Sequence, residues 1–288
     1  MPQAVAPVVN AFFDPVTWTI TYVVRAPGAS ACAVIDPVLN YDRRNGRVST
    51  GSIDAVCDFV KTHGLSVAWV MDTHVHADHM TGLAEMARRT GAKTAIGAPV
   101  RVVQKTFAGL YNLPGFPCDG SQFDRLLEDG DQIQVDGLCV TALHVPGHTP
   151  ACMAYHIGDA VFVGDTLFMP DFGTARCDFP GGDAATLYRS TRRLLELPPD
   201  TRMFVGHDYG PGGRDIAWET SVAAQKATNI HARDGISEAE FVTMRQSRDA
   251  TLEMPELLLP SLQVNIRAGN LPEPESNGTR YLKFPLRR

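Results

Sequence analysis

The 288-residue chain lacks the marks of a secreted or membrane-spanning protein. Its six cysteines stand apart, with no C-x-x-C pair, which is unlike a disulfide framework and predicts a reducing compartment. No apolar run reaches the roughly 18 residues of a membrane-spanning helix. The first residues also lack a basic stretch followed by an apolar one, as a signal peptide would have. We therefore expect a cytoplasmic protein with no membrane partner.

An excess of basic residues is missing as well. Lysine and arginine number 26 against 32 aspartates and glutamates, which gives a net charge of −6. Binding to nucleic acid or to an anionic membrane needs a basic face, so neither partner is expected. The composition is that of an ordinary globular protein, with no repeat, low-complexity run or linker. We predict a single domain over residues 1–288, with a short Pro-rich C-terminal extension from about residue 235.

Short strands and helices follow one another along the chain, which predicts a mixed α/β fold. Residues 16–25 and 31–35 alternate in polarity and predict an opening antiparallel pair, followed by a polar surface excursion at 40–51. Ser52 is the expected N-cap of the next helix. The other expected strands are 66–71, 93–96, a hairpin over 131–145, 152–157, 160–163 and 202–205. The other expected helices are near 83–90, 99–108, 183–195, 215–230 and 237–249.

The densest cluster of metal-binding residue types lies at 72–79, directly after the apolar run 65–71. It contains His74, His76, Asp78 and His79. Without partners these groups would each cost several kcal/mol to bury, and a divalent cation would remove that cost. The alternative is a polar surface loop that is merely rich in histidine.

Three later positions place a metal-binding side chain beside glycine at the end of a short strand. They are His148 in Gly-His-Thr, Asp165 in Gly-Asp-Thr and His207 in Gly-His-Asp. Each one alone is more typical of a structural turn. Together with the cluster at 72–79, they predict side chains that meet at one rim of a sheet, where functional loops are held by a rigid scaffold.

The order of these motifs resembles that of the metallo-β-lactamase superfamily. The motifs are His-x-His-x-Asp-His at 74–79, Gly-His-Thr, Gly-Asp-Thr and Gly-His. The resemblance implies a four-layer αββα sandwich with a metal site at one edge of the paired sheets. A first site would use His74, His76, His148 and Asp165, and a second site would use Asp78, His79 and His207 with Asp165 bridging.

Within that superfamily, five segments resemble the persulfide dioxygenase (sulfur dioxygenase) family. They are 73–82, 146–152, 175–179, 206–209 and 270–274, with departures at Ala151 and Cys177. The resemblance implies one Fe²⁺ per chain, held by His74, His148 and Asp165, with Zn²⁺ as the other metal considered. Glutathione persulfide and O₂ would give sulfite and glutathione. The remaining candidates, His76, Asp78, His79 and His207, would be further ligands or would orient the ligands.

Glutathione carries two carboxylates, so its site should offer a cation that binds carboxylates in a bidentate manner. By resemblance, Arg176 is the first candidate for substrate binding, followed by Tyr209 and Arg214. The alternative for Arg176 is a structural ion pair with Asp171 or Asp178. The resemblance also allows a homodimer.

Several polar residues have a structural as well as a functional interpretation. Cys152 and Cys177 are either redox-active or small core residues. We expect His144 and His156, which lie in predicted strands, to have ordinary packing. We expect His63 and His231 to lie on the surface.

Two rival functions use the same motifs. A glyoxalase II-like thioester hydrolase would hold two metals and use a metal-bound hydroxide, and every ligand that it needs is present. A metal-bound scaffold that binds a sulfur species without turnover is the other alternative.

Overall fold

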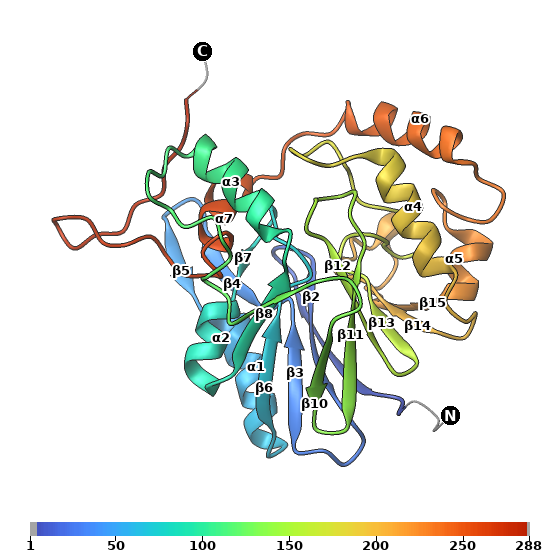
Figure 1. Ribbon diagram of the computed structural model, residues 1–288, viewed down its shortest axis with the longest axis horizontal. Helices are drawn as coiled ribbons and strands as arrows, with labels where there is room; N and C mark the ends of the chain where they lie inside the picture. The colour runs from blue at the N-terminus through green and yellow to red at the C-terminus, as the bar shows by residue number, and fades with distance from the viewer. Residues whose placement is uncertain (1–4, 287–288) are drawn as a thin grey trace.

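The computed structural model describes residues 5–286, in which two six-stranded sheets lie face to face between two groups of helices (Figure 1). The first sheet has the order β1-β2-β3-β6-β8-β9, with antiparallel pairing up to β3 and parallel pairing from β3 onward. Its strands are β1 (Val8–Asp14), β2 (Thr19–Arg25), β3 (Ala31–Ile35), β6 (Ser66–Met71), β8 (Lys93–Gly97) and β9 (Arg125–Leu127).

The second sheet runs β10-β11-β12-β13-β14-β15 and is antiparallel except for the parallel pair β13 and β14. Its strands are β10 (Gln132–Val135), β11 (Leu138–His144), β12 (Met153–Ile157), β13 (Ala160–Phe162), β14 (Arg202–Phe204) and β15 (Glu219–Ser221). A small third sheet joins β5 (Arg47–Ser49), β4 (Val38–Asp42) and β7 (Met80–Thr81). The polar excursion predicted at 40–51 is therefore mostly a β4–β5 hairpin.

Helices cover the outer face of each sheet (Figure 1). Beside the first sheet lie α1 (Gly51–Thr62), α2 (Leu83–Thr90), α3 (Val100–Leu110) and α7 (Leu258–Asn265). Beside the second sheet lie α4 (Ala184–Leu195), α5 (Val222–Thr228) and α6 (Glu238–Asp249), and a short 3₁₀ turn spans Pro211–Gly213. The predicted four-layer αββα arrangement is confirmed. Among residues 5–286, no helix has the length and apolar character needed to span a bilayer.

The two-residue period of the strands divides the apolar side chains between two cores. On β2, Ile20 and Tyr22 pack in the core between the two sheets, whereas Val23 packs under the helices of the first sheet. Neighbouring strands alternate in the same way, because successive side chains of a strand point to opposite faces. A sheet buried on both faces is rigid, and the loops at its strand ends are therefore held in place.

Three local predictions were wrong for identifiable reasons. The N-cap of α1 is Thr50, because the Ser52 hydroxyl instead donates to Asp14 Oδ2 at 2.6 Å. The helix predicted at 215–230 is divided into β15 and the short α5, with Ser221 as the N-cap. Helix α7 was missed because seven of its eight residues are buried, so its sequence has no amphipathic period. The helices predicted at 183–195 and 237–249 are confirmed; Asp183 is the N-cap of α4, and Ser237 begins α6 with a capping box.

Candidate metal centre

The loop after β6 is held by Asp36, a buried residue directly after the neighbouring strand β3. Thr73 donates its backbone N–H to Asp36 Oδ1 at 2.7 Å and its hydroxyl to Asp36 Oδ2 at 2.9 Å. These bonds fix the first turn of the loop that carries His74. Asp36 is not among the predicted site residues, although a carboxylate between a buried strand and Pro37 is a usable signal.

The hydrogen bonds of Thr73 also select the tautomer of His74. Because the Thr73 hydroxyl donates to Asp36, its oxygen accepts a hydrogen bond from His74 Nδ1, 3.0 Å away. The proton of the neutral ring is then on Nδ1, and Nε2 carries a lone pair. That Nε2 is buried and has no hydrogen-bond partner.

His148 is oriented in the same way by a backbone carbonyl. Its Nδ1 lies 2.6 Å from the carbonyl oxygen of Arg176, which can only accept, so Nδ1 is the protonated nitrogen. Gly147 precedes it with φ +139°, and a Cβ there would lie 2.3 Å from Leu187 Cα. The close approach of α4 therefore requires glycine beside this histidine.

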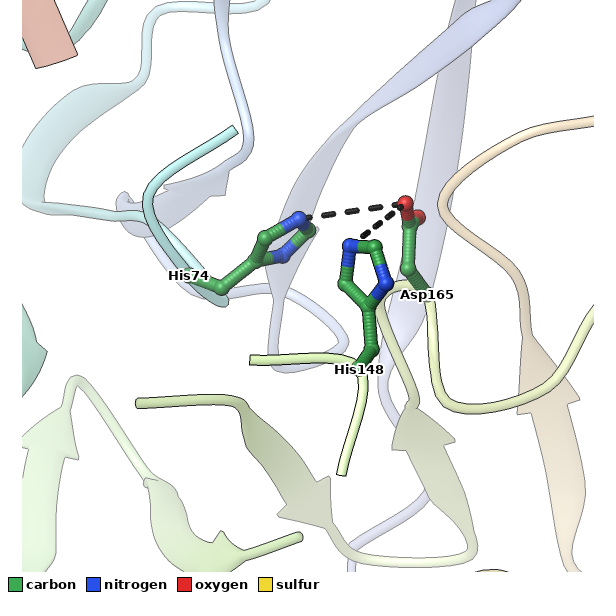
Figure 2. Close-up of side chains that lie close together, drawn as sticks. All are labelled: His74, His148 and Asp165. Carbon is green, nitrogen blue, oxygen red and sulfur yellow. Dashed lines mark ion pairs between the residues drawn. The ribbon is translucent and has the colours of Figure 1, made fainter. Parts of the chain in front are cut away.

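The free nitrogens of the two rings converge on one carboxylate (Figure 2). Asp165 Oδ2 lies 3.8 Å from His74 Nε2 and 3.7 Å from His148 Nε2. Their ligand atoms all lie within 4.8 Å of one another, and all three residues are buried. Two lone pairs and a carboxylate oxygen repel one another without a cation between them. This donor set therefore fits a divalent metal ion, and the three residues predicted from separate strand ends do meet.

The other four candidates form a second cluster beside the first. His207 lies between two carboxylates, with Nδ1 2.7 Å from Asp165 Oδ1 and Nε2 2.6 Å from Asp78 Oδ2. His79 Nδ1 lies 3.4 Å from Asp78 Oδ1. His76 Nε2 lies 3.1 Å from Asp36 Oδ1. One buried ring nitrogen remains without a partner in each of two residues, His76 (Nδ1) and His79 (Nε2).

Burial and neighbouring charges shift the pKa values of the residues in the cluster in different directions. Burial, with the nearby His76, lowers the pKa of His74 well below its ordinary value, which keeps the ring neutral and able to bind a metal. Burial opposes ionisation of Asp165, but His207 outweighs it and lowers the pKa of the carboxyl. Burial likewise opposes a charge on His207, but Asp165 and Asp78 raise its pKa well above the ordinary value. His207 is therefore a cation held between two carboxylates.

Two supporting groups lie in helices near the C-terminus, and no sequence motif marks them. The Asn265 side-chain amide of α7 donates to the carbonyls of His76 and His79, each at 2.8 Å, and its oxygen accepts from Thr81 N–H. In α6, Asp249 accepts from the backbone N–H of Cys177 at 2.9 Å and pairs with the buried Arg245 at 2.6 Å. Both helices therefore brace loops that position metal ligands.

A cleft of about 1130 Å³ opens onto the cluster, and its lining includes the buried His148 and Asp165 and the half-buried Asp78. Its walls include five aromatic side chains, which give an apolar surface beside the polar ligands: Trp18, Phe168, Phe172, Phe179 and Tyr209. The rim includes exposed residues of the β4–β5 turn and of α6. The excursion predicted as simple surface is thus part of the cleft wall.

The three predicted substrate-binding residues have different positions. Arg176 and Tyr209 both line the cleft. Arg176 also makes the anticipated ion pair with Asp178, at 2.6 Å, so its structural interpretation holds as well. Arg214 is not a lining residue; it binds the carboxylates of Asp208 and Asp171 and fastens the loop after β14.

The remaining predictions concern two cysteines and two histidines, and the exposure of each side chain tests them. Cys152 and Cys177 are buried free thiols, and burial raises the pKa of each to about 12, so both are unreactive core residues in this structure. The prediction that His231 lies on the surface was wrong. Its ring is buried against Gly173 and accepts a hydrogen bond from Thr174 N–H at 3.0 Å. His63 is exposed, as predicted.

Residues 20–207 match the family model described as the metallo-beta-lactamase superfamily, and the chain belongs to that superfamily. A probable metallo-hydrolase of Burkholderia pseudomallei is 53% identical, and the match covers 96% of this chain and 98% of the relative. Glyoxylase B2 of Dictyostelium discoideum is 50% identical, with 88% of each chain covered.

The predicted resemblance to persulfide dioxygenases is also confirmed. The crystal structure of ETHE1 from Myxococcus xanthus superposes with a TM-score of 0.73 at 30% identity, covering 91% of this chain and 100% of that one. The human mitochondrial persulfide dioxygenase ETHE1 is 27% identical, with 89% of this chain and 87% of the relative covered. The chain therefore belongs to a superfamily of metal-dependent enzymes and has persulfide dioxygenases among its relatives.

Proposed function

We propose that this protein is a mononuclear non-haem iron dioxygenase that oxidises glutathione persulfide with O₂. One observation carries the proposal: the side chains of His74, His148 and Asp165 converge, with Nδ1 of each imidazole turned to an acceptor and Nε2 turned to the carboxylate, while both nitrogens of His207 bind carboxylates. Two histidines and one carboxylate with open positions are the donor set of non-haem Fe(II) oxygenases. A second metal in a site that includes His207 would have to displace the contact of His207 with Asp78.

In the proposed reaction, glutathione persulfide, O₂ and water give glutathione, sulfite and two protons. The outer sulfur is oxidised by O₂, and the S–S bond breaks. Bound iron would supply a redox-active centre with vacant coordination positions beside that sulfur. The chain orients the ligands: His207 outweighs burial and lowers the pKa of Asp165, burial lowers the pKa of His74, and both imidazoles donate an Nδ1 proton to a fixed acceptor.

The surrounding residues have positioning roles. His207 donates to Asp165 Oδ1 and so keeps Oδ2 turned toward the two free imidazole nitrogens. The aromatic cleft wall excludes water from the buried end and offers apolar surface to the persulfide. Arg176 holds His148 through its carbonyl, while its guanidinium is engaged by Asp178.

The second candidate is a binuclear thioester hydrolase. It is supported by the relatives described as a probable metallo-hydrolase and glyoxylase B2, which are 53% and 50% identical, and by the unpartnered nitrogens of His76 and His79, which could serve as ligands. In that enzyme a metal-bound hydroxide would attack the thioester carbonyl. The two candidates therefore differ in the number of metals and in the need for O₂.

A paired assay on one preparation tests the proposal. Protein reconstituted with Fe²⁺ should consume O₂ when given glutathione persulfide, form sulfite, and hydrolyse S-lactoylglutathione slowly or not at all. His148→Ala should abolish O₂ uptake, and His63→Ala, a matched change at an exposed histidine outside the site, should not. Fast hydrolysis of the thioester without O₂ uptake, together with two metals per chain, would replace this proposal with the hydrolase.

A further inference from the structure

The exposed rim of the cleft carries two arginines that have no ion-pair partner among the described residues. Arg44 lies in the β4–β5 turn and Arg248 in the last turn of α6, and both line the cleft. Within residues 5–286, neither guanidinium makes an ion pair or hydrogen bond; only their backbone groups do so. The two residues come from segments more than two hundred positions apart.

The other arginines around the cleft are engaged. Arg176 pairs with Asp178, and the buried Arg245 pairs with Asp249. Arg43 bridges from the β4–β5 turn to Glu256, beyond α6, at 2.7 Å. This bridge ties together the two segments that carry Arg44 and Arg248, so both unpaired cations belong to one rim.

Unpaired cations at this place are unexpected in a chain of net charge −6. The overall charge repels an anionic ligand, whereas the carboxylates of Asp78 and Asp165 in the cleft are already paired with His207. Positive charge at the rim offsets that repulsion for a ligand whose anionic groups remain at the rim while its reactive end enters the cleft. Planar guanidinium groups bind carboxylates through two parallel hydrogen bonds.

We infer that Arg44 and Arg248 bind the carboxylates of the glutathione part of the substrate and thereby determine its selection over persulfides that lack remote carboxylates. The inference rests on the proposed function for the identity of the reacting group. Glutathione has one carboxylate at each end and its sulfur on the middle residue, a chain of roughly 10 Å. Its sulfur can therefore enter the apolar cleft while both ends remain at the rim.

Binding of S-methylglutathione tests this inference without turnover. In Zn²⁺-loaded protein, titration calorimetry should show that Arg44→Gln and Arg248→Gln each raise the dissociation constant about five- to tenfold, and that the double variant raises it by about the product. Arg47→Gln is the matched control, because Arg47 is an exposed residue of the same hairpin that does not line the cleft. Its affinity should equal that of the unmodified protein.

Kinetics give the second readout. With glutathione persulfide, the double variant should raise KM and leave kcat nearly unchanged, since these contacts are the same before and during reaction. With 2-hydroxyethyl persulfide, which has no carboxylate, KM should not change. Unchanged affinity in the double variant, an equal loss in Arg47→Gln, or no binding to the unmodified protein would overturn the inference. If the binding results hold but O₂ is not consumed, the arginine site stands and the dioxygenase proposal fails.

Discussion

Replacing Asp249 by asparagine tests whether the C-terminal helix α6 supports the metal centre. The Asp249 carboxylate pairs with Arg245, and their side chains are 5% and 1% exposed, so solvent screens the pair little. Asparagine has nearly the same shape and can still accept from Cys177 N–H, but it leaves the buried guanidinium without a counter-charge. Removing one partner of such a pair costs about 3–5 kcal/mol.

The change should also reach the metal ligands. Asp249 and Arg245 hold the backbone on either side of Arg176, through Cys177 N–H and the Thr174 carbonyl, and the carbonyl of Arg176 orients His148. Groups that orient ligands typically affect metal affinity about 10–100-fold. We expect the lower end of that range, because the effect passes through one backbone segment.

Urea unfolding of the metal-free protein and a competitive metal titration measure the two effects. The double variant Arg245→Met/Asp249→Leu is the control, because replacing a buried ion pair by apolar residues of similar size is often neutral. It should recover most of the stability lost in Asp249→Asn. A loss below about 1 kcal/mol in the single variant, or an equal loss in the double variant, would refute the argument.

Three further predictions concern single residues. Burial lowers the pKa of His231 from its ordinary 6.5 to about 4, so the unfolded chain binds the extra proton between these values. The free energy of unfolding should therefore fall by about 3 kcal/mol as the pH drops from ~6.5 to ~4, and His231→Asn should flatten that part of the urea-unfolding profile. Gly147→Ala forces a Cβ against Leu187 at positive φ; thermal unfolding should reveal a loss of about 2 kcal/mol or more, and wild-type stability would contradict the steric argument. Mass spectrometry after brief iodoacetamide treatment of the native protein should find Cys118 alkylated and the buried Cys152 unmodified; equal labelling would show that Cys152 is accessible.

Parts of the fold and of the site could be predicted where a residue type at a given spacing has a single physical explanation. A carboxylate or imidazole beside glycine at a strand end predicted His148 and Asp165, and the structure brings both to His74. Alternating strands and the Asp136-Gly137 turn likewise predicted the β10–β11 hairpin. These signals are local, so no tertiary information was needed to find them.

The residues that orient the ligands were not predictable in that way. Asn265 reaches the loop at 76–79 from a helix nearly two hundred positions later, and its helix had no amphipathic period to reveal it. Arg44 lies in a hairpin whose polar sequence looked like plain surface, and only the fold shows that this hairpin borders the cleft. Their roles depend on long-range contacts, which residue type and spacing do not encode.

Filling of a second metal site that includes His207 depends on a proton at that residue. Its ring is held between Asp78 and Asp165, which raise its pKa well above the ordinary value, so a second metal must displace a bound proton. Occupancy of the second site should therefore rise with pH, while the site formed by His74, His148 and Asp165 fills first because both Nε2 atoms already face Asp165 Oδ2 and burial lowers the pKa of His74. Metal analysis after dialysis at several pH values should give one ion per chain near neutrality and more only in alkaline buffer. Two ions per chain bound with equal affinity at pH 6 would show that the proton on His207 presents no barrier, and the structural argument for a mononuclear enzyme would be lost.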